Sequence, residues 1–542
     1  PSPELLRLEL DQPVACTMPN VICGLTRMLD CLFLPFVPKE TEEEPDPEAV
    51  LAAKQKLPTL IEPLFFMGLI WSAGASCSGK SRLVFDEHLR AQMKEAGSKA
   101  GLLATRGLVY DFVFDTDETK WKPWMQTIAD FSIDPKTNFQ LDYASIIVPT
   151  DQSVCYANLV GRLLDGRQHV LAVGPTGTGK TVTVVQKLSQ GLADTFEPIM
   201  MAFSAQTSAN QSQDIVDAKL DKRRKGVFGP PMGKRCVIFV DDLNMPALET
   251  YGAQPPIEIL RQFMDHKGWY DRKENVFRNL VDLSWVAAMG PPGGGRNQIT
   301  PRYMRHFNII AYTPFDDASM QRIFQTILDW WLRKEGFEPA YTKLSAPIIA
   351  ATMDIYKGSI ISLLPTPSKS HYTFNLRDFA RVVQGVLLSD KADFEQSGDL
   401  ILLWSHELFR VFYDRLIDSE DRQWFLDETK QLCTKHFDQP LPGLFQKCGI
   451  RCEDDVGEDD VRYLIFSSFS DPKASKKTYK RVPDPIELQK TMAGYLDDYN
   501  QISSKPMKLV LFLFCVEHVC RITRVLQMPR GNALLAGVGG SG

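Results

Sequence analysis

The sequence predicts a mixed α/β fold, in which helices sandwich a parallel sheet and helical subdomains lie on either side. Residues 169–173 form a short, uninterrupted apolar run of the kind that a buried parallel strand shows. A glycine-rich loop follows this run directly, and residues 182–190 then have the pattern of a helix that ends at Gly191. The flanking residues, 49–135 and 318–440, have mostly helical apolar spacing. Strand, loop and helix in this order are typical of a parallel sheet covered by helices.

The glycine-rich loop has the pattern G-x-x-x-x-G-K-[ST], which is the phosphate-binding P-loop. It consists of Gly174, Pro175, Thr176, Gly177, Thr178, Gly179, Lys180 and Thr181. In such a loop, backbone N–H groups and the dipole of the following helix hold phosphate oxygens, and glycines let the backbone approach them closely. We expect Lys180 at the β- and γ-phosphates and the Thr181 hydroxyl at Mg²⁺. The motif therefore predicts a bound nucleotide with Mg²⁺.

A second apolar run, residues 236–240, predicts another buried strand, and it ends in two carboxylates. Asp241, at the carboxyl end of this strand, is placed to hold Mg²⁺ directly or through water. Asp242 stands where hydrolytic proteins of this wider class usually carry glutamate. Aspartate is one methylene shorter, and a misplacement of ~1 Å can slow a reaction about a hundredfold. The sequence therefore supports nucleotide binding more strongly than fast hydrolysis.

Length and composition limit the classes of protein that this chain fits. A chain of 542 residues is too long for one hydrophobic core and suggests roughly three or four domains. Its net charge of -6 indicates no strong overall attraction to nucleic acid or to an anionic membrane. Eleven cysteines are scattered without C-x-x-C pairs, which favours reduced intracellular thiols over a disulfide framework.

The longest apolar runs, residues 60–71 and 509–516, are shorter than the ~20 residues that a membrane span needs. We expect both runs to be buried core elements, and we expect no membrane span. No secretory signal is predicted, because Glu4, Arg7 and Glu9 interrupt the first residues. The chain begins without methionine and stops inside a glycine-rich motif, so we interpret it as a piece of a longer protein.

Two further stretches have part or all of the P-loop pattern. Residues 533–536 predict a strand that leads into residues 537–542, the first six positions of another such motif. Residues 74–81 match the complete pattern, but the apolar run before them looks helical rather than strand-like. We therefore favour a loop inside a helical subdomain over a second functional P-loop there. Two acidic stretches, residues 39–48 and 441–460, predict an exposed loop and a linker.

Taken together, the motifs resemble those of the third AAA+ module of a dynein heavy chain, and the axonemal type fits best. They comprise the P-loop and residues 239–246, 251–256, 290–296, 301–307 and 404–415. The resemblance implies four parts: the helical lid that ends the second module (1–140), the large α/β subdomain of the third module (141–317), its helical lid (318–440), and a linker with the start of the fourth module (441–542). It also implies that residues 74–81 are part of a lid that holds no phosphate.

The resemblance implies roles for residues outside the P-loop. Val148, Pro149 and Thr150 resemble the loop that packs on adenine. Arg377 resembles sensor II, near the γ-phosphate of the same module. Arg305 resembles the arginine finger that points into the site of the second module, a task that suits the fixed fork of arginine. A surface salt bridge is the alternative for Arg377, and a structural arginine at a subdomain seam is the alternative for Arg305.

A second departure from the wider pattern concerns the sensor I position, where an asparagine is expected and this sequence has Gly290. With Asp242, it makes two departures that affect hydrolysis and leave binding intact. We therefore expect slow turnover at this site. The expected catalytic residues are Asp242 and Arg377 at this site and Arg305 at the site of the second module. The resemblance implies an ATP-binding, regulatory segment of a microtubule motor whose nucleotide state gates the ring of modules. The alternatives are a non-motor AAA+ remodelling ATPase and a nucleotide-binding scaffold that does not hydrolyse.

The implied partners are the neighbouring AAA+ modules, dynein intermediate and light chains, and microtubules through parts outside this segment. Nucleic acid is not expected. The implied location is the cytoplasm and cytoskeleton, and in particular the axoneme of a cilium or flagellum.

Four other patterns have simpler interpretations. His406 and Glu407 begin a zinc motif that position 410, an arginine, does not complete. Residues 222–225 are basic and are expected in a solvated loop, and the tryptophans at 330–331 are expected in a core or interface. The glycines at 293–295 are expected in a flexible loop rather than in a dinucleotide-binding motif.

Overall fold

The computed structural model describes residues 10–37, 47–95, 97, 107–133, 143–447, 449–450, 452, 455–535 and 537, with no side-chain detail for 47–55 and 144. The chain divides into two compact units. The first combines Pro1–Asp130 with Pro149–Phe315, and the second combines Phe131–Val148 with Asp316–Gly542. Most of the acidic loop expected at 39–48 lies outside the described residues.

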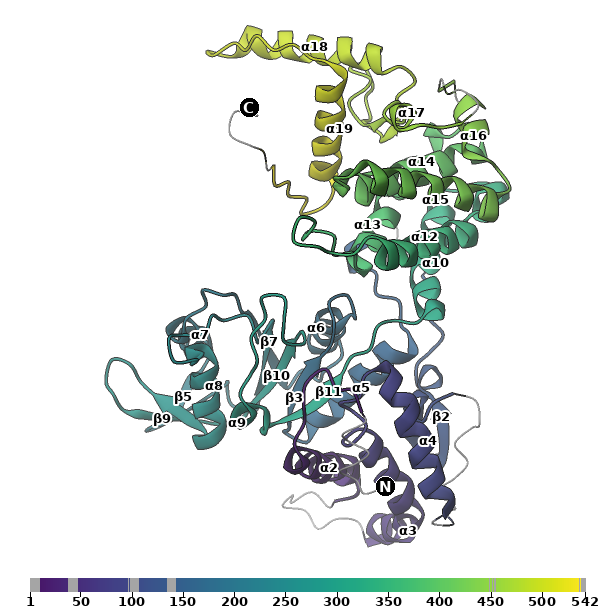
Figure 1. Ribbon diagram of the computed structural model, residues 1–542. Helices are drawn as coiled ribbons and strands as arrows, with labels where there is room; N and C mark the ends of the chain where they lie inside the picture. The colour runs from purple at the N-terminus through teal and green to yellow at the C-terminus, as the bar shows by residue number, and fades with distance from the viewer. Residues whose placement is uncertain are drawn as a thin grey trace. The chain divides into compact units, whose positions relative to one another are not determined.

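The first unit contains a five-stranded sheet in the order β11-β3-β10-β7-β4, and every neighbouring pair is parallel (Figure 1). The strands are β3 (His169–Val173), β4 (Phe196–Ala202), β7 (Arg235–Asp241), β10 (Leu283–Met289) and β11 (Phe307–Ala311). The predicted parallel sheet is confirmed, and so are both strands expected from apolar runs. Because parallel strands share one carboxyl edge, the ends of β3 and β7 meet at the same edge of the sheet.

Side chains of the central strands alternate between two hydrophobic cores, one on each face of the sheet. Val170 and Ala172 pack with α5 (Asp151–Asp165) and α6 (Lys180–Gln190). Leu171 and Val173 lie on the other face of the sheet, in the other core. Helices α7 (Ala209–Asp217) and α8 (Pro255–His266) cover that other face (Figure 1). Burial on both faces explains why these strands read as uninterrupted apolar runs.

A second, four-stranded sheet in the order β5-β6-β9-β8 belongs to the same unit. Its strands are β5 (Asp221–Arg224), β6 (Val227–Gly229), β8 (Gly268–Tyr270) and β9 (Phe277–Leu280). The basic residues 222–225, expected in a solvated loop, lie in β5 and in the turn to β6, so the expected loop is wrong, although all of them except Arg223 are exposed as expected. The turn forms at Gly226, whose φ of 74° glycine adopts without strain. Arg223 is paired with Asp282 at 2.7 Å, which anchors the strand.

Helices of the N-terminal segment pack on the α5 face of the large sheet. They are α2 (Met18–Phe33), α3 (Pro47–Ile70) and α4 (Gly79–Glu95), followed by a hairpin of β1 (Phe112–Asp115) and β2 (Lys120–Pro123). Most of the apolar run at 60–71 is buried there, as predicted, although Ile61 and Phe65 are exposed. The Arg82 guanidinium donates a 2.7 Å hydrogen bond to the carbonyl of Ala311, and the Ala311 amide donates one of 2.7 Å to Ala75. The N-terminal helices are thus fastened to the end of β11.

Residues 74–81, which match the P-loop pattern, form a turn between two helices. Helix α3 precedes them, and α4 already begins at Gly79. The Ser81 hydroxyl is buried and accepts a 2.7 Å hydrogen bond from the backbone of Asp11. The prediction of a loop inside a helical subdomain is confirmed, because no strand leads into the motif and its serine has a structural partner.

The second unit begins with a group of helices. They are α10 (Asp317–Lys334), α11 (Pro339–Thr342), α12 (Ser345–Ser362), α13 (Leu376–Val386), α14 (Ser397–Val411), α15 (Ser419–Phe437) and α16 (Leu441–Lys447). Trp330 and Trp331 are buried in it, which confirms their interpretation as core residues. The linker expected at 441–460 is corrected in its first part, where α16 forms because Leu441 and Phe445 are fully buried against the other helices.

The C-terminal part of this unit consists of α17 (Glu458–Val461), the short strands β12 (Phe466–Ser467) and β13 (Lys480–Arg481), α18 (Pro485–Ile502) and α19 (Leu513–Gln527). Two predictions are corrected here. Val510 is 83% exposed and Phe514 is 52% exposed, so the run at 509–516 is buried only at its end. Residues 533–535 form no strand. The other residues of the expected strand and of the incomplete P-loop pattern that follows it, apart from Gly537, lie outside the described residues. An apolar run becomes a buried strand only where other strands pair with it.

A buried polar network joins α14 to α19. The Arg524 guanidinium donates to both carboxylate oxygens of Glu407, at 3.1 and 2.8 Å from its Nε, and the Tyr479 hydroxyl donates to Glu407 at 2.9 Å. His406 lies 3.0 Å from that hydroxyl and 2.8 Å from the carbonyl of Leu464. Burial holds the pKa of His406 well below its ordinary value, so the imidazole is neutral in the fold. These contacts give His406 and Glu407 a structural role.

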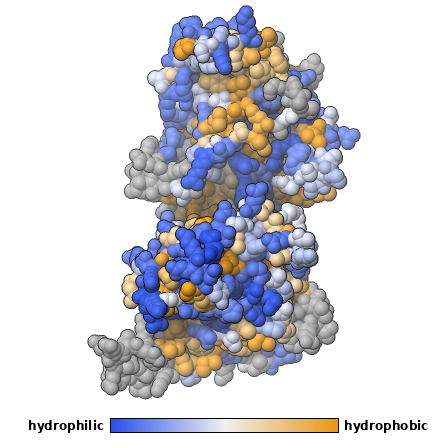
Figure 2. All heavy atoms as spheres, turned by 90° about the vertical axis from the view of Figure 1, so that its left-hand side faces the viewer, coloured by the Kyte–Doolittle hydropathy of each residue, from blue (hydrophilic) through white to orange (hydrophobic). Residues whose placement is uncertain are grey.

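On the face shown in Figure 2, hydrophilic residues are interspersed with hydrophobic ones, in keeping with the 24% of charged residues in the sequence. None of the helices in the described part of the chain has the length and apolar character needed to cross a membrane.

Candidate functional site

Gly174 follows the last residue of β3 and lies against Tyr312, the residue that follows β11. A Cβ at this position would be 2.3 Å from the carbonyl oxygen of Tyr312, a distance that real Cβ atoms do not adopt. The Tyr312 amide donates a 2.7 Å hydrogen bond to Val173, and the Gly174 amide donates one of 3.2 Å to Met289. The absence of a side chain therefore lets the loop leave the sheet between β10 and β11.

Two further glycines shape the loop itself. Gly177 has a φ of 88° and Gly179 a φ of 72°, both in the left-handed region that favours glycine. Helix α6 begins directly afterwards, at Lys180. Left-handed residues beside a helix N-terminus turn successive N–H groups toward one concave side, which binds anions. The loop thus has the backbone geometry of a phosphate site.

The Lys180 ammonium lies over this loop. It donates hydrogen bonds of 2.8 Å to the carbonyl of Gly174 and 2.7 Å to that of Pro175, and it lies 3.3 Å from the Thr178 hydroxyl. The Thr178 hydroxyl is buried and donates to Pro175 at 3.1 Å. A positive charge and a row of amides are therefore gathered at one place, as phosphate binding requires.

The two residues expected to hold Mg²⁺ are in contact. The Thr181 hydroxyl donates a 3.2 Å hydrogen bond to a carboxylate oxygen of Asp241, across from α6 to the end of β7. Burial raises the pKa of Asp241, and the neighbouring Asp242 charge raises it further. One hydroxyl and one carboxylate beside a phosphate cradle are the oxygen ligands that Mg²⁺ prefers, so the residues present fit this ion.

Asp242 follows β7 with a φ of 51°, a strained conformation for a residue other than glycine. The turn is held because the Leu243 amide donates a 3.0 Å hydrogen bond to Ala288 of β10. The Asp242 side chain is 51% exposed, and one of its oxygens lies 3.9 Å from the guanidinium of Arg296. The fold thus presents this carboxylate to solvent at the sheet edge that carries the P-loop.

Arg296 is a site residue that the sequence reasoning missed. Its Nη2 lies 3.4 Å from the hydroxyl of Thr176 in the P-loop, and its side chain passes over Gly290. The signal was present as three glycines directly before an arginine, a pattern typical of a tight turn that presents the next side chain. The glycines at 293–295 form this turn, with a bridge between Gly293 and Arg296, so the expected loop has the form of a tight hairpin.

Comparisons with known proteins agree with this geometry. A family model described as the P-loop containing dynein motor region matches residues 133–315, and one described as the P-loop containing dynein motor region D4 matches residues 507–542. The dynein heavy chain AAA lid domain matches residues 1–126, and the AAA+ lid domain matches residues 348–442.

Curated relatives match nearly the whole chain. Dynein axonemal heavy chain 1 of Mus musculus is 43% identical to this chain. The aligned stretch covers 99% of this chain and 13% of that protein. Dynein axonemal heavy chain 12 of Rattus norvegicus is 46% identical over 88% of this chain and 16% of its own length. The chain belongs to the dynein heavy chain family.

Dynein axonemal heavy chain 3 of Homo sapiens extends the comparison, with 41% identity over 90% of this chain and 12% of its own length. The chain spans between 12% and 16% of the length of these three relatives. It is therefore a dynein motor AAA+ region of the axonemal type, in a family of nucleotide-binding ATPases.

The arginine finger expected in this dynein segment lies just after the short helix α9 (Pro301–Met304). The Arg305 side chain is 57% exposed and pairs with Asp265 at 2.6 Å, and His306 contacts the same carboxylate at 2.8 Å. Arg27 of α2 donates to the Arg305 carbonyl at 3.3 Å. The partners of Arg305 thus lie away from the P-loop, and its action on another module stays a prediction.

The expected adenine loop has a clear local role in this fold. The Thr150 hydroxyl caps α5 by accepting a 3.3 Å hydrogen bond from the Ser153 amide, and both Val148 and Thr150 are buried. Pro149 lies between them. Arg377 belongs to the second unit, where its side chain is exposed and its amide donates to the side chain of Asn375 at 2.9 Å. The roles of these residues toward a nucleotide stay predictions.

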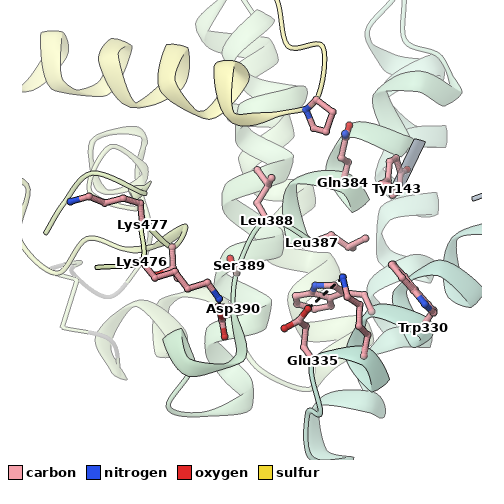
Figure 3. Close-up of a pocket in the computed structure, with 14 residues that line it drawn as sticks. Tyr143, Trp330, Glu335, Gln384, Leu387, Leu388, Ser389, Asp390, Lys476 and Lys477 are labelled. Carbon is pink, nitrogen blue, oxygen red and sulfur yellow. Dashed lines mark hydrogen bonds and ion pairs between the residues drawn. The ribbon is translucent and has the colours of Figure 1, made fainter. Parts of the chain in front are cut away.

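The second unit has a cavity of about 340 Å³ of its own (Figure 3). Its lining includes Trp330, Lys334 and Glu335 of the helical group, and Asp390 and Lys476. The charged groups pair with one another, since Lys476 bonds Asp390 and Lys334 lies 3.8 Å from Glu335. None of the residues expected at the nucleotide is among those that line this cavity.

Proposed function

We propose that the chain is the part of an axonemal dynein heavy chain that carries the third AAA+ module, and that this module binds Mg²⁺ with ATP or ADP as a regulatory site. The observation that carries the proposal is the P-loop geometry: left-handed glycines before α6, Lys180 over the loop, and Thr181 in contact with Asp241. In this assignment residues 1–140 end the second module, 141–317 and 318–440 form the third, and 441–542 begin the fourth.

Each P-loop residue has a distinct task in binding. The amides around Gly177 and Gly179 hold phosphate oxygens, and Lys180 adds a charge on the β- and γ-phosphates. Thr181 and Asp241 hold Mg²⁺, which neutralises charge on the phosphates when bound. Because burial raises the pKa of Asp241, its carboxylate takes up a proton at a higher pH than an ordinary aspartate does, and the affinity for the metal falls as that proton is taken up.

The residues around the phosphates favour binding over rapid turnover. Asp242 would orient the attacking water, but its side chain is shorter than the usual glutamate, and its carboxylate lies 3.9 Å from the guanidinium of Arg296. Gly290 offers no side chain to that water. The module therefore acts as a switch that is set by its nucleotide and reset slowly, and it biases the arrangement of the neighbouring modules. Arg377 would act on the same nucleotide and Arg305 on that of the second module.

The family supplies the larger setting for this switch. The relatives are named axonemal dynein heavy chains, so the whole protein would act on microtubules through parts outside this segment. Its further partners would be intermediate and light chains, in the axoneme of a cilium or flagellum. A non-motor remodelling ATPase is not favoured, because the matching P-loop models are those of dynein motor regions.

A titration of a fluorescent ATP analogue against Lys180→Ala tests the proposed binding. Loss of a charge-assisted hydrogen bond costs about 1.5–3 kcal/mol, so we expect the affinity to fall between about tenfold and a hundredfold. Lys222→Ala is the matched control, because it removes the same charge from an exposed residue of β5 in the same unit. Equal affinities for wild type and Lys180→Ala would contradict the proposal.

A nucleotide-binding scaffold that never hydrolyses is the second candidate, and the geometry of Asp242 and Gly290 favours it. Asp242→Asn separates it from a slow ATPase, since removing a general base slows proton transfer on the order of a hundredfold or more. We expect slower phosphate release in a single turnover of the intact heavy chain. Asp221→Asn, at an exposed residue of β5, should have no effect. An unchanged rate in Asp242→Asn would favour the scaffold.

A further inference from the structure

We propose that Arg296 senses the terminal phosphate of a nucleoside triphosphate bound at the P-loop, from the space that Gly290 leaves open beside Asp242. The inference rests on the proposed nucleotide binding and adds to it the residue by which this site distinguishes a triphosphate from a diphosphate.

A glycine hairpin presents Arg296. The amide of Gly293 donates to the carbonyl of Arg296 at 3.0 Å, and the amide of Arg296 donates back at 3.1 Å. Between them, Gly294 and Gly295 have φ angles of 57° and 86°. Two successive left-handed residues form the tight turn that reverses a hairpin, and glycine adopts them at least cost. The backbone of Arg296 is therefore fixed by the turn rather than by its own side chain.

The hairpin is fastened to the loop that follows β7. The Asn297 amide donates to the carbonyl of Asn244 at 2.9 Å, and its side chain donates to Pro246 at 2.7 Å. The fully buried Asn244 side chain donates to the carbonyl of Gly290 at 2.9 Å, at the start of the hairpin. These bonds hold Arg296 in a set position relative to Asp242, which begins the same loop.

Gly290 makes room for the arginine. A Cβ on Gly290 would lie 2.7 Å from Nε and 2.8 Å from Cδ of Arg296, so any side chain there would displace the guanidinium. Gly290 lacks a polar side chain, and the charged side chain of Arg296, six residues further along the chain, covers it. This contact explains how the site retains a polar group beside Gly290.

The guanidinium lies beside the place where a terminal phosphate would be expected. Its Nη2 is 3.4 Å from the P-loop hydroxyl of Thr176 and 3.9 Å from Asp242. The residue that orients the attacking water acts at the γ-phosphate, so the neighbourhood of Asp242 marks that end of a triphosphate. The buried Nε of Arg296 has no hydrogen-bond partner among the described residues. A guanidinium with a donor to spare suits phosphate oxygens, which it contacts through a planar fork.

The ratio of affinities for fluorescent ATP and ADP analogues tests this role. We expect Arg296→Ala to weaken binding of the ATP analogue about tenfold and to leave binding of the ADP analogue nearly unchanged, because only the triphosphate reaches the guanidinium. Arg296→Lys should restore part of the preference, since it returns the charge without the fork. Gly290→Ala should lower the same ratio, because it displaces the guanidinium without removing its charge.

Arg302→Ala is the matched control, since Arg302 is an exposed arginine of α9 in the same unit, and we expect its ratio to equal that of wild type. Thermal unfolding of each variant serves as the measure of folding. If wild type binds both analogues and Arg296→Ala keeps the ratio, or lowers both affinities equally, the inference is overturned. If wild type binds neither analogue, the proposed function itself fails, which is a different result.

Discussion

Glu407→Gln is expected to lower the free energy of unfolding of the second unit by about 3–5 kcal/mol, among the largest effects of any single substitution in this chain. Glu407 is fully buried, and Arg524 beside it is only 7% exposed. The substitution keeps the shape of the side chain but leaves the arginine charge without its counter-ion. The Glu407 charge also raises the pKa of Arg524, so the guanidinium keeps its proton at every accessible pH.

Urea unfolding followed by circular dichroism measures this loss. Glu395→Gln removes the same charge from an exposed residue of the same unit, and its effect should stay within about 0.5 kcal/mol. Replacing both Glu407 and Arg524 with methionine should recover part of the stability, because no buried charge is then left alone. Equal midpoints for Glu407→Gln and Glu395→Gln would show that the pair contributes little to the joining of α14 and α19.

Gly174→Ala is expected to reduce both nucleotide affinity and stability of the first unit. The added methyl would lie 2.3 Å from the backbone oxygen of Tyr312, and a backbone atom cannot rotate away as a side-chain end can. The loop must shift from β3, which moves the amides that hold phosphate. Overpacking of this kind costs about 1–3 kcal/mol, and we expect the affinity for the fluorescent ATP analogue to fall at least tenfold.

Gly79→Ala is the control, because Gly79 is a glycine of the other sequence with the P-loop pattern, where it occupies the position of Gly179. A Cβ on Gly79 meets nothing within 4 Å, and α4 already begins there, so alanine should leave stability unchanged or raise it slightly. Melting temperature and nucleotide affinity are measured for both variants. Similar effects of the two substitutions would contradict the view that only the loop at 174–181 is a nucleotide site.

The sequence was sufficient for the large sheet and for the P-loop. Strands β3 and β7 are apolar without interruption because both of their faces are buried, and that property is written in consecutive residues. The loop could be found because its glycines, Lys180 and Thr181 are all within eight positions. Asp241 could be paired with Thr181 because parallel strands end at one edge.

Other features were missed because they depend on which segments meet. The run at 509–516 is as apolar as a core strand, yet Val510 and Phe514 are exposed, since burial depends on partners that a local pattern does not contain. Residues 222–224 lie in a strand because β5 pairs with β6, and Arg223 also contacts Asp282, 59 positions away. The acidic residues of 441–460 led to the prediction of a linker, although Leu441 and Phe445 in the same stretch are buried as part of α16.

By itself, then, the sequence determined the fold class, the phosphate-binding loop and the family, because each of these depends on residues that are close in the chain or on motifs in a fixed order. Only the tertiary structure decided which side chains lie beside the P-loop. Arg296 lies over Gly290 and beside Asp242 because a hairpin and the loop after β7 are fastened together through Asn244. Such a contact between two loops leaves no periodic signal in either of them.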